Sequence, residues 1–385
     1  MKTNKEAILF SKYRYPEQDA GALRQHAFAK MFLELGYSVT VVGLGESTGR
    51  KTAVYDGIEY ISLRYGSKSV LAKVASHCLF RRNLSRFLRK RKVDVIWVND
   101  VGEKSFSYLK HKAKKDDISL IHDSVEWYSP EQFAKGKKSY EYIAKNRLNT
   151  MLVDSSVKVV AISKFLEEHF LRKGCATIRI PVVLDVQNSL IDKEYPSSDV
   201  LNILYAGRPA SKDTLDVICQ GIALLSEEER KRIKFVIRGI TPENLVQNCG
   251  VSKELYELIQ GCIDIKGYVS RQEIKEEMKK ADLTVLMRVD NARYAKAGFP
   301  TKVVESMMNS TPVICNITSD LGMYLRNRQN SIAVKDNSPV AFVEALREAL
   351  NMSIEDKINM RAEARKTAEE EFDYRKYVSV LSELL

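Results

Sequence analysis

Short apolar runs alternate with amphipathic runs along most of the chain. In the first half the apolar runs occupy residues 7–10, 38–43, 94–100, 118–123 and 157–163, and residues 20–35 between the first two have the spacing of a helix. Near-continuous runs of Val, Ile and Leu, separated by helical sequence, are typical of a parallel sheet covered on both faces.

A polar stretch with one Pro and paired Ser interrupts this rhythm at residues 188–199 and has the composition of a linker. Apolar runs then resume at residues 201–207, 233–239, 263–269, 283–287, 312–316 and 331–334. We therefore predict an α/β chain of two Rossmann-like, doubly wound domains, 1–188 and 189–371, facing each other across a cleft. Ligands of such sheets bind at the carboxyl ends of the strands.

Length and composition agree with a two-domain protein of the cytoplasm. A chain of 385 residues exceeds what one hydrophobic core usually supports. No apolar run approaches the roughly 20 residues needed to span a bilayer, and the N-terminus does not resemble a signal peptide. The six Cys and five His lie far apart, so we expect reduced thiols and no zinc site.

The net charge of +11 belongs entirely to the first half of the chain. Residues 1–200 hold 34 Lys+Arg against 23 Asp+Glu, and the remainder holds 27 of each. The densest segment, residues 79–92 (LFRRNLSRFLRKRK), has seven basic residues and no acid, with apolar residues at helical spacing. It is either an ordinary solvated helix or a peripheral face for anionic lipid headgroups or a lipid-linked phosphate. Nucleic acid is the least favoured partner, because no recognised motif accompanies the charge.

Two segments of the second half carry candidate chemistry. In residues 204–218 (LYAGRPASKDTLDVI), Arg208 and Lys212 occupy the turn between a strand and a helix, where two cations and a helix N-terminus suit a diphosphate. In residues 295–308 (AKAGFPTKVVESMM), a turn precedes a helix that Thr301 could cap and that carries Glu305, whose carboxylate could accept the hydroxyls of a ribose. The alternatives are two surface cations near Asp213 and a plain helix cap.

These segments, with residues 16–43 (PEQDAGALRQHAFAKMFLELGYSVTVVG) and 265–287 (IKGYVSRQEIKEEMKKADLTVLM), resemble the group 1 (family 4) glycosyltransferases of the GT-B fold, in the same order along nearly the whole chain. The resemblance implies a retaining transferase that uses a nucleotide-diphosphate sugar without a metal or other cofactor. It is closest to members that build bacterial surface polysaccharides. It also implies that the first domain takes the acceptor, that the second binds the donor, and that residues 372–385 pack back on the first.

The resemblance also assigns residues to the site. Arg208 and Lys212 match the pair that holds the donor diphosphate, and Glu305 matches the second acid of an E-x7-E motif, which binds the ribose. Gly298, Phe299 and Pro300 match the loop whose backbone amides face the donor sugar and phosphate, and Thr301 and Lys302, which follow it, are expected to bind the donor as well. Near the base lie Gly267, Tyr268 and Val269.

Two further residues come from the first domain. Gly21 matches the first strand–helix loop, which approaches the donor. His122 resembles a histidine that follows a central strand and is assigned a catalytic role with Arg208 and Lys212. Asp123 and Glu126 are alternatives to His122 for any polar role there.

The chain departs from the family pattern at two places. Ala297 stands where E-x7-E has its first acid, and Arg288 and Asp290 are the nearest polar residues that could replace that acid. Asp213 stands where a glycine usually follows the lysine of the cation turn, and the spacing from Arg208 to Lys212 is one residue shorter than the commoner pattern.

The expected partners are a nucleotide sugar, for which UDP is the commonest base, and a glycan or polyprenyl-linked acceptor. Two other functions remain open: a non-catalytic subunit that binds sugar or a partner enzyme, and a nucleotide-sugar epimerase.

Overall fold

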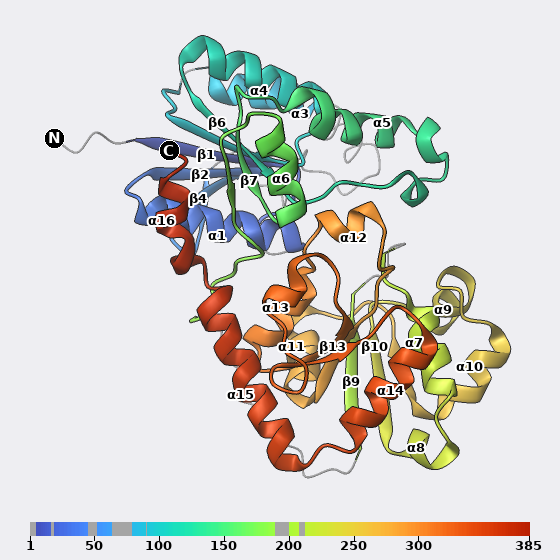
Figure 1. The fold of residues 1–385 in the computed structure, drawn as a ribbon. Coiled ribbons are helices and arrows are strands. Elements are labelled where there is room, and N and C mark those ends of the chain that lie inside the picture. Colours follow the sequence, from blue (N-terminus) through green and yellow to red (C-terminus); the bar gives the residue numbers. More distant parts are fainter. Residues whose placement is uncertain are drawn as a thin grey trace. The chain divides into compact units, whose positions relative to one another are not determined.

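The computed structural model describes residues 5–16, 19–44, 52–63, 79–89, 91–188, 200–207 and 212–385. Contacts divide the chain into two units. The first unit comprises residues 1–185, Ala297–Phe299 and Asp373–Leu385, and the second comprises Val186–Lys296 and Pro300–Phe372. Figure 1 shows a parallel sheet with flanking helices in each unit.

The first unit holds an eight-stranded sheet in the order β3-β4-β2-β1-β5-β6-β7-β8. All neighbouring strands are parallel except β3 and β4, which form an antiparallel pair. The strands are β1 (Glu6–Ser11), β2 (Ser38–Gly43), β3 (Ala53–Tyr55), β4 (Ile58–Ser62), β5 (Val95–Asn99), β6 (Ser119–Ser124), β7 (Lys158–Ala161) and β8 (Thr177–Arg179). The helices are α1 (Ala20–Glu34), α3 (Phe80–Leu88), α4 (Glu103–Asp116), α5 (Tyr140–Arg147), α6 (Lys164–Arg172) and α16 (Val378–Ser382).

The second unit holds a six-stranded, all-parallel sheet in the order β11-β10-β9-β12-β13-β14. Its strands are β9 (Leu201–Ala206), β10 (Ile233–Arg238), β11 (Ile263–Lys266), β12 (Leu283–Leu286), β13 (Val313–Asn316) and β14 (Ser331–Val334). Its helices are α7 (Leu215–Ala223), α8 (Glu227–Lys231), α9 (Pro242–Asn248), α10 (Lys253–Ile259), α11 (Arg271–Lys280), α12 (Arg293–Ala297), α13 (Thr301–Met308), α14 (Pro339–Leu350) and α15 (Ile354–Glu371).

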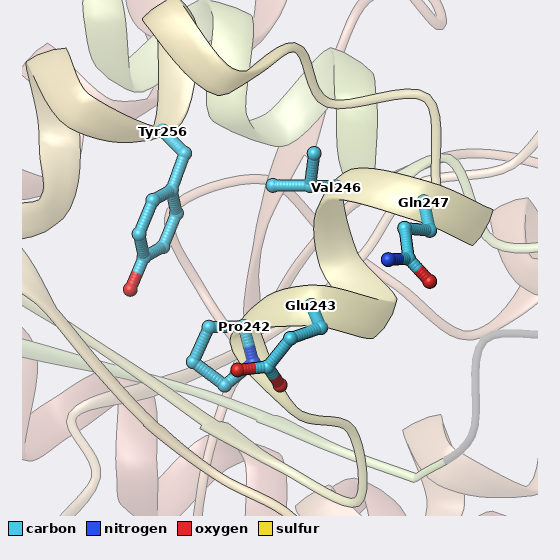
Figure 2. A pocket seen from close by; sticks show the side chains of 5 residues that line it. All are labelled: Pro242, Glu243, Val246, Gln247 and Tyr256. Atoms are coloured by element: carbon cyan, nitrogen blue, oxygen red, sulfur yellow. The ribbon is translucent and has the colours of Figure 1, made fainter.

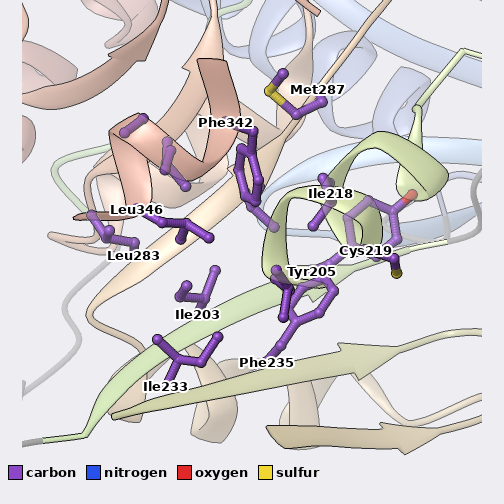
Figure 3. Close-up of a cluster of buried hydrophobic side chains, with 14 of the residues drawn as sticks. Ile203, Tyr205, Ile218, Cys219, Ile233, Phe235, Leu283, Met287, Phe342 and Leu346 are labelled. Atoms are coloured by element: carbon purple, nitrogen blue, oxygen red, sulfur yellow. The ribbon is translucent and has the colours of Figure 1, made fainter. Parts of the chain in front are cut away.

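The core of the second unit joins its sheet to α7 and α14. Side chains of β9, β10 and β12 meet those of the two helices in one buried cluster, whose members include Ile203, Tyr205, Ile218, Phe235, Leu283, Phe342 and Leu346 (Figure 3). Burying apolar surface stabilises a fold by about 25 cal/mol per Å². The apolar runs along the chain therefore become strands because both faces of this sheet are covered.

The two doubly wound sheets confirm the predicted fold class. Every apolar run of the sequence coincides with, or overlaps, a strand of the structure. The runs did not reveal β3 and β8, which are the two edge strands of the first sheet, or β4, which lies between β3 and β2. Edge strands are short and only partly covered, and β3 and β8 contain no fully buried residue, so their sequences lack a strong apolar signal.

Helix α3 has the amphipathic pattern that was predicted for residues 79–92. Phe80, Leu84 and Leu88 are fully buried, whereas Arg81, Arg82, Arg86 and Arg89 are exposed. Among the described residues, no helix is long and apolar enough to cross a membrane.

Candidate functional site

The strand order of the second unit places its ligand crevice at β9. The chain leaves β9 toward β10 on one side, and β12 pairs with β9 on the other side. The connections therefore run in opposite directions from the neighbouring strands β9 and β12, and this is where open α/β sheets bind ligands, at the carboxyl ends. Gly207 follows β9 and Arg288 follows β12 at this edge.

The buried Asp213 carboxylate accepts hydrogen bonds from three side chains at this edge of the sheet. Asp213 Oδ2 accepts a hydrogen bond from Lys302 Nζ at 2.7 Å and another from the Tyr205 hydroxyl at 2.9 Å. Its Oδ1 accepts from Arg288 Nε at 3.2 Å. Lys302 Nζ also donates to the Tyr205 hydroxyl at 3.0 Å and lies 4.2 Å from the centre of the Tyr205 ring. We call these four residues the Asp213 cluster.

The charges of the Asp213 cluster depend on one another. Burial alone would raise the pKa of Asp213, but Lys302 and Arg288 bring the pKa below its ordinary value. Burial lowers the pKa of Lys302, and Arg288 adds to this, while Asp213 and Glu305 oppose it. Burial and the neighbouring Asp213 carboxylate raise the pKa of Tyr205 far above its ordinary value, so the phenol stays protonated. The cluster therefore joins one acidic and two basic side chains, and the pKa of Asp213 and that of Lys302 each depend on the other group.

A second layer of hydrogen bonds fixes the backbone of Arg288. Its N–H donates to Asn316 Oδ1 at 2.9 Å, and its carbonyl accepts from Asn316 Nδ2 at 2.6 Å. Asn316 Nδ2 also donates to Asp290 Oδ1, and Asp290 Oδ2 accepts from the Asn337 N–H at 3.0 Å. Thr214 Oγ1 donates to Asn337 Oδ1 at 2.7 Å. The ends of β12, β13 and β14 are thereby tied to the start of α7.

Two glycines make room for Lys302. Gly207 has φ of +135°, and a Cβ there would lie 2.9 Å from Lys302 Cε. Gly239, which follows β10 with φ of +110°, would place a Cβ 2.6 Å from the Gly207 carbonyl oxygen. Both the positive φ and the close contacts require glycine. The lysine side chain therefore lies directly over the turn that follows β9.

The structure brings together several residues that the sequence proposed. Lys302 and Arg288, both predicted to bind the donor, meet at Asp213, and Lys212 is the residue before Asp213 in the chain. Arg208 lies outside the described residues. Glu305 occupies the next turn of α13 after Lys302, close enough to influence the pKa of Lys302.

The start of α13 differs in one detail from the prediction. Pro300, in extended conformation, is the N-cap residue, and Thr301 is the first helical residue, so Thr301 does not cap the helix. Pro300 makes no side-chain capping hydrogen bond, and the Val303 N–H donates to the Pro300 carbonyl at 3.1 Å. The first amides of a helix lack intrahelical partners, and with the helix dipole they attract anions.

The segment predicted to lie near a base follows β11. Tyr268 is 82% exposed, whereas Val269 is buried. The Gly267 carbonyl accepts a hydrogen bond from the Gly239 N–H at 3.0 Å, so the turns after β10 and β11 are joined. This leaves the Tyr268 ring available for a flat ligand at the same edge of the sheet as the Asp213 cluster.

A surface pocket of about 270 Å³ lies between α9 and α10 (Figure 2). Pro242, Glu243, Val246, Gln247 and Tyr256 line it. None of the residues predicted to bind the donor contributes to this pocket, so we do not include it in the site.

In the first unit, Gly21 lies in the first turn of α1, beneath an aromatic ring. A Cβ at Gly21 would lie 2.2 Å from the Tyr13 ring, so a larger residue there would displace that ring. The Tyr13 hydroxyl donates to Asn99 Oδ1 at 2.7 Å, at the carboxyl end of β5. Tyr13 therefore covers the glycine that was predicted to approach a donor.

His122 does not have the surroundings of a catalytic residue. Its ring packs edge-on against Phe106 and Phe170, and neither ring nitrogen makes a hydrogen bond of ordinary geometry, although the Val98 backbone interacts with the ring. Burial lowers the pKa of His122 to about 4, so the ring is neutral at physiological pH. Because side chains alternate along a strand, His122 and its neighbour Asp123 point to opposite faces of the sheet. The structure therefore does not support the catalytic role predicted for His122.

Asp123 instead joins a buried polar network at the carboxyl edge of the first sheet. Arg24 of α1 donates to both of its carboxylate oxygens, from Nε at 2.9 Å and from Nη2 at 2.8 Å. Asn99 Nδ2 donates to Asp123 Oδ2 at 2.8 Å. The sequence indicates Asp123 as an alternative to His122, but it does not indicate Arg24, Asn99 or Tyr13 as members of this network. The position of Asn99 at a strand end is the one sequence feature that could have pointed to it.

Among the described residues, no group of three or more His, Cys, Asp and Glu side chains is arranged to hold a metal ion.

Comparison with known families identifies the class of protein. Residues 187–370 match the model of the glycosyl transferases group 1, and residues 21–184 match that of the glycosyl transferase 4-like domain. The chain belongs to the group 1 glycosyltransferases, which confirms the resemblance seen in the sequence.

Solved structures share the fold along the whole chain. Sucrose-phosphate synthase from Thermosynechococcus elongatus superposes with a TM-score of 0.74 at 12% identity, covering 99% of this chain and 98% of that one. Anabaena Alr3699/HepE in complex with UDP and glucose superposes with a TM-score of 0.67 at 14% identity, again covering 99% and 98%. At these identities the similarity shows the GT-B fold alone.

One curated relative is similar in sequence. An uncharacterized 42.6 kDa protein in the cps region of Klebsiella pneumoniae is 22% identical over 306 residues, which covers 72% of this chain and 78% of that protein.

Proposed function

We propose that this glycosyltransferase moves a sugar from a nucleotide-diphosphate sugar to a glycan or polyprenyl-linked acceptor during the synthesis of a cell-surface polysaccharide. The observation that carries the proposal is the meeting of Lys302 and Arg288 beside the N-terminus of α13, at the carboxyl edge where β9 and β12 adjoin. Two cations and free helix amides at this edge suit a diphosphate.

The donor would lie across the carboxyl edge of the second sheet. Its diphosphate would contact Lys302, Arg288, Lys212 and Arg208, together with the first amides of α13. Glu305 would accept hydrogen bonds from the ribose hydroxyls, and the exposed Tyr268 would lie near the base. Arg288 would also replace the acid that Ala297 removes from the E-x7-E motif. The structural neighbour Alr3699/HepE supports a nucleotide of this kind, since its structures hold UDP with glucose in one complex and UDP-glucose in another.

The chemistry follows from the negative charge that develops on the diphosphate as its bond to the sugar breaks. Breaking the bond between sugar and diphosphate places negative charge on the leaving oxygen, and fixed cations and amides stabilise it without reorganising. The acceptor hydroxyl would attack the oxocarbenium-like sugar from the face that the diphosphate leaves, and the leaving phosphate would take the proton. This route retains configuration and uses no metal. It also needs no basic side chain, so a neutral, enclosed His122 is no obstacle.

The role in surface polysaccharides rests on the relatives. The Klebsiella pneumoniae protein is encoded in the cps region, and the structural neighbour WaaG is a glycosyltransferase involved in lipopolysaccharide biosynthesis. Acceptors of such pathways are carried on lipids, and the exposed arginines of α3 offer a face for an anionic membrane surface.

A thermal-shift screen tests the donor class first. UDP, GDP, ADP, CDP and dTDP, each with its common sugar conjugates, are added to the full chain, and a bound donor should raise the melting temperature. The donor found is then incubated with and without lipid-linked acceptors, and glycosylated product is detected by mass spectrometry. Acceptor-dependent transfer supports the proposal. Conversion of the donor to another nucleotide sugar would indicate an epimerase, and binding without turnover would indicate a non-catalytic subunit.

A further inference from the structure

The Asp213 cluster contains an anion at the place where an anionic ligand is expected. Asp213 has 6% of its side chain exposed, and it contacts both cations and the Tyr205 hydroxyl. A carboxylate in a diphosphate site repels the ligand, so its presence requires an explanation. The resemblance gives none, because a glycine is the usual residue at this position.

We propose that Asp213 is a positioning residue, which holds the Lys302 ammonium and the Arg288 guanidinium at the carboxyl edge of the sheet and keeps Lys302 protonated for the donor diphosphate. This inference rests on the proposed function, because it assumes that the cluster faces a donor. It goes beyond that function by assigning a role to a residue that departs from the family pattern.

The geometry indicates that Asp213 positions the two basic side chains and does more than neutralise their charge. The two carboxylate oxygens divide the cations between them, with Lys302 on Oδ2 and Arg288 on Oδ1. Asp213 and Arg288 also pair through an isolated antiparallel bridge, so their backbones are fixed relative to each other. Lys302 has 31% of its side chain exposed, which leaves part of it accessible to a ligand. A single side chain thus sets the separation of two cations, one that follows β12 and one in the first turn of α13.

Four groups that face Lys302 influence whether its amine is charged. Asp213 before α7 and Glu305 on α13 favour its charged form, whereas Arg288 after β12 disfavours it, and the Tyr205 phenol on β9 is neutral. The nearest acid is Asp213, at 2.7 Å. Removing that carboxylate leaves Lys302 beside Arg288 in partly buried surroundings, so the pKa of Lys302 must fall further below its ordinary value.

The first test needs no ligand. Lys302 is acylated by a trace of acetic anhydride at a series of pH values, and mass spectrometry gives the titration midpoint of its amine. In Asp213→Asn the midpoint should fall by about one pH unit relative to the wild-type chain. Asp213→Glu should restore it, and Glu257→Gln, an exposed acid of α10, should leave it unchanged. If Asp213→Asn does not fold, Asp213→Gly, with the residue usual in the family, takes its place. An unchanged midpoint overturns the proposal.

The second test uses the nucleoside diphosphate that the wild-type chain binds best, titrated by calorimetry at several pH values. The ratio of the Kd of Asp213→Asn to that of the wild type should rise with pH, toward a limit of about tenfold for a shift of one pH unit, because Lys302 loses its proton earlier in the variant. A purely structural role would shift the ratio equally at every pH, and that result contradicts the proposal. In a Lys302→Met background the pH-dependent difference should disappear.

Failure of this inference is distinguishable from failure of the proposed function. If the chain transfers sugar and Lys302→Met weakens diphosphate binding, but Asp213→Asn leaves the pH profile unchanged, only the role of Asp213 is wrong. If Lys302→Met binds every diphosphate as the wild type does, the donor-site assignment is wrong, and this inference with it.

Discussion

Lys302 shows at the scale of one residue how burial and pairing shape a binding group. It lies over the turn after β9, donates to Asp213 and Tyr205, and stands two residues into α13. A charge-assisted hydrogen bond to a phosphate contributes about 1.5–3 kcal/mol.

We predict that Lys302→Met weakens binding of the nucleoside diphosphate by about tenfold to 100-fold, because methionine keeps the length of the side chain but not its charge. Calorimetry on the folded variant measures the change. Lys253→Met, which changes an exposed lysine of α10, is the matched control and should bind as the wild type does. Equal affinity of Lys302→Met and the control would contradict the donor role.

Glu305 allows a second test at the residue scale. Its carboxylate is proposed to bind ribose, whereas its carbonyl accepts a hydrogen bond from Asn309 Nδ2 at 2.6 Å and does not depend on the side chain. We predict that Glu305→Ala weakens binding of UDP, or of the diphosphate found in the screen, by about tenfold, and changes binding of inorganic pyrophosphate much less, because pyrophosphate has no ribose. Parallel loss for both ligands would show a general effect on the site instead.

Some residues of the candidate site could be predicted from the sequence, and others could not. Lys302 and Arg288 could be proposed from sequence because they adjoin a helix start and a strand end. His122 could not be judged, because its environment depends on Phe106 and Phe170, which come from helices before and after its own strand. Asp213 looked like a departure, and only the fold shows that it contacts both cations.

At the scale of one element, α3 has an exposed basic face and a buried apolar face. The fully buried Phe80, Leu84 and Leu88 hold it on the first unit, which leaves Arg81, Arg82 and Arg86 at the surface. The helix therefore does not need its arginines for packing.

We predict that changing Arg81, Arg82 and Arg86 together to Gln reduces binding to vesicles rich in phosphatidylserine without loss of stability. Each basic residue near an anionic surface contributes about 1 kcal/mol, so the loss should approach 100-fold and should shrink as salt is added. Co-sedimentation measures it. Gln at Lys231, Lys253 and Lys266, exposed on the second unit, is the control of equal charge. If the wild-type chain does not bind the vesicles, or binds them equally at all salt concentrations, α3 is an ordinary solvated helix.

At the scale of the whole molecule, the chain returns to its first unit after completing the second. Residues Asp373–Leu385 belong to the first unit, and Tyr374, Tyr377, Leu381 and Leu384 enter its hydrophobic core. The Tyr374 N–H donates to the Leu184 carbonyl at 3.0 Å. The last residues of the chain thus stabilise the unit that its first residues begin.

We predict that Leu381→Ala destabilises the first unit by about 2–5 kcal/mol, the usual cost of truncating a fully buried leucine. Differential scanning calorimetry should show the unfolding transition of this unit moving to lower temperature. Glu383→Ala, an exposed residue of the same segment, should have no such effect. An equal loss in both variants would mean that the segment acts through something other than the core.

The sequence by itself determined the two sheets and the order of their strands along the chain, because runs of Val, Ile and Leu must be buried on both faces wherever they fall. It also located the turn after β9 and the start of α13, since glycine, proline and charge at strand ends are local signals. Only the tertiary structure decided which of these groups meet. Asp213 and Lys302 are 89 residues apart, and they touch because β12 pairs with β9 and places α13 over the glycine turn. Contacts of this kind depend on strand pairing, which no local pattern encodes.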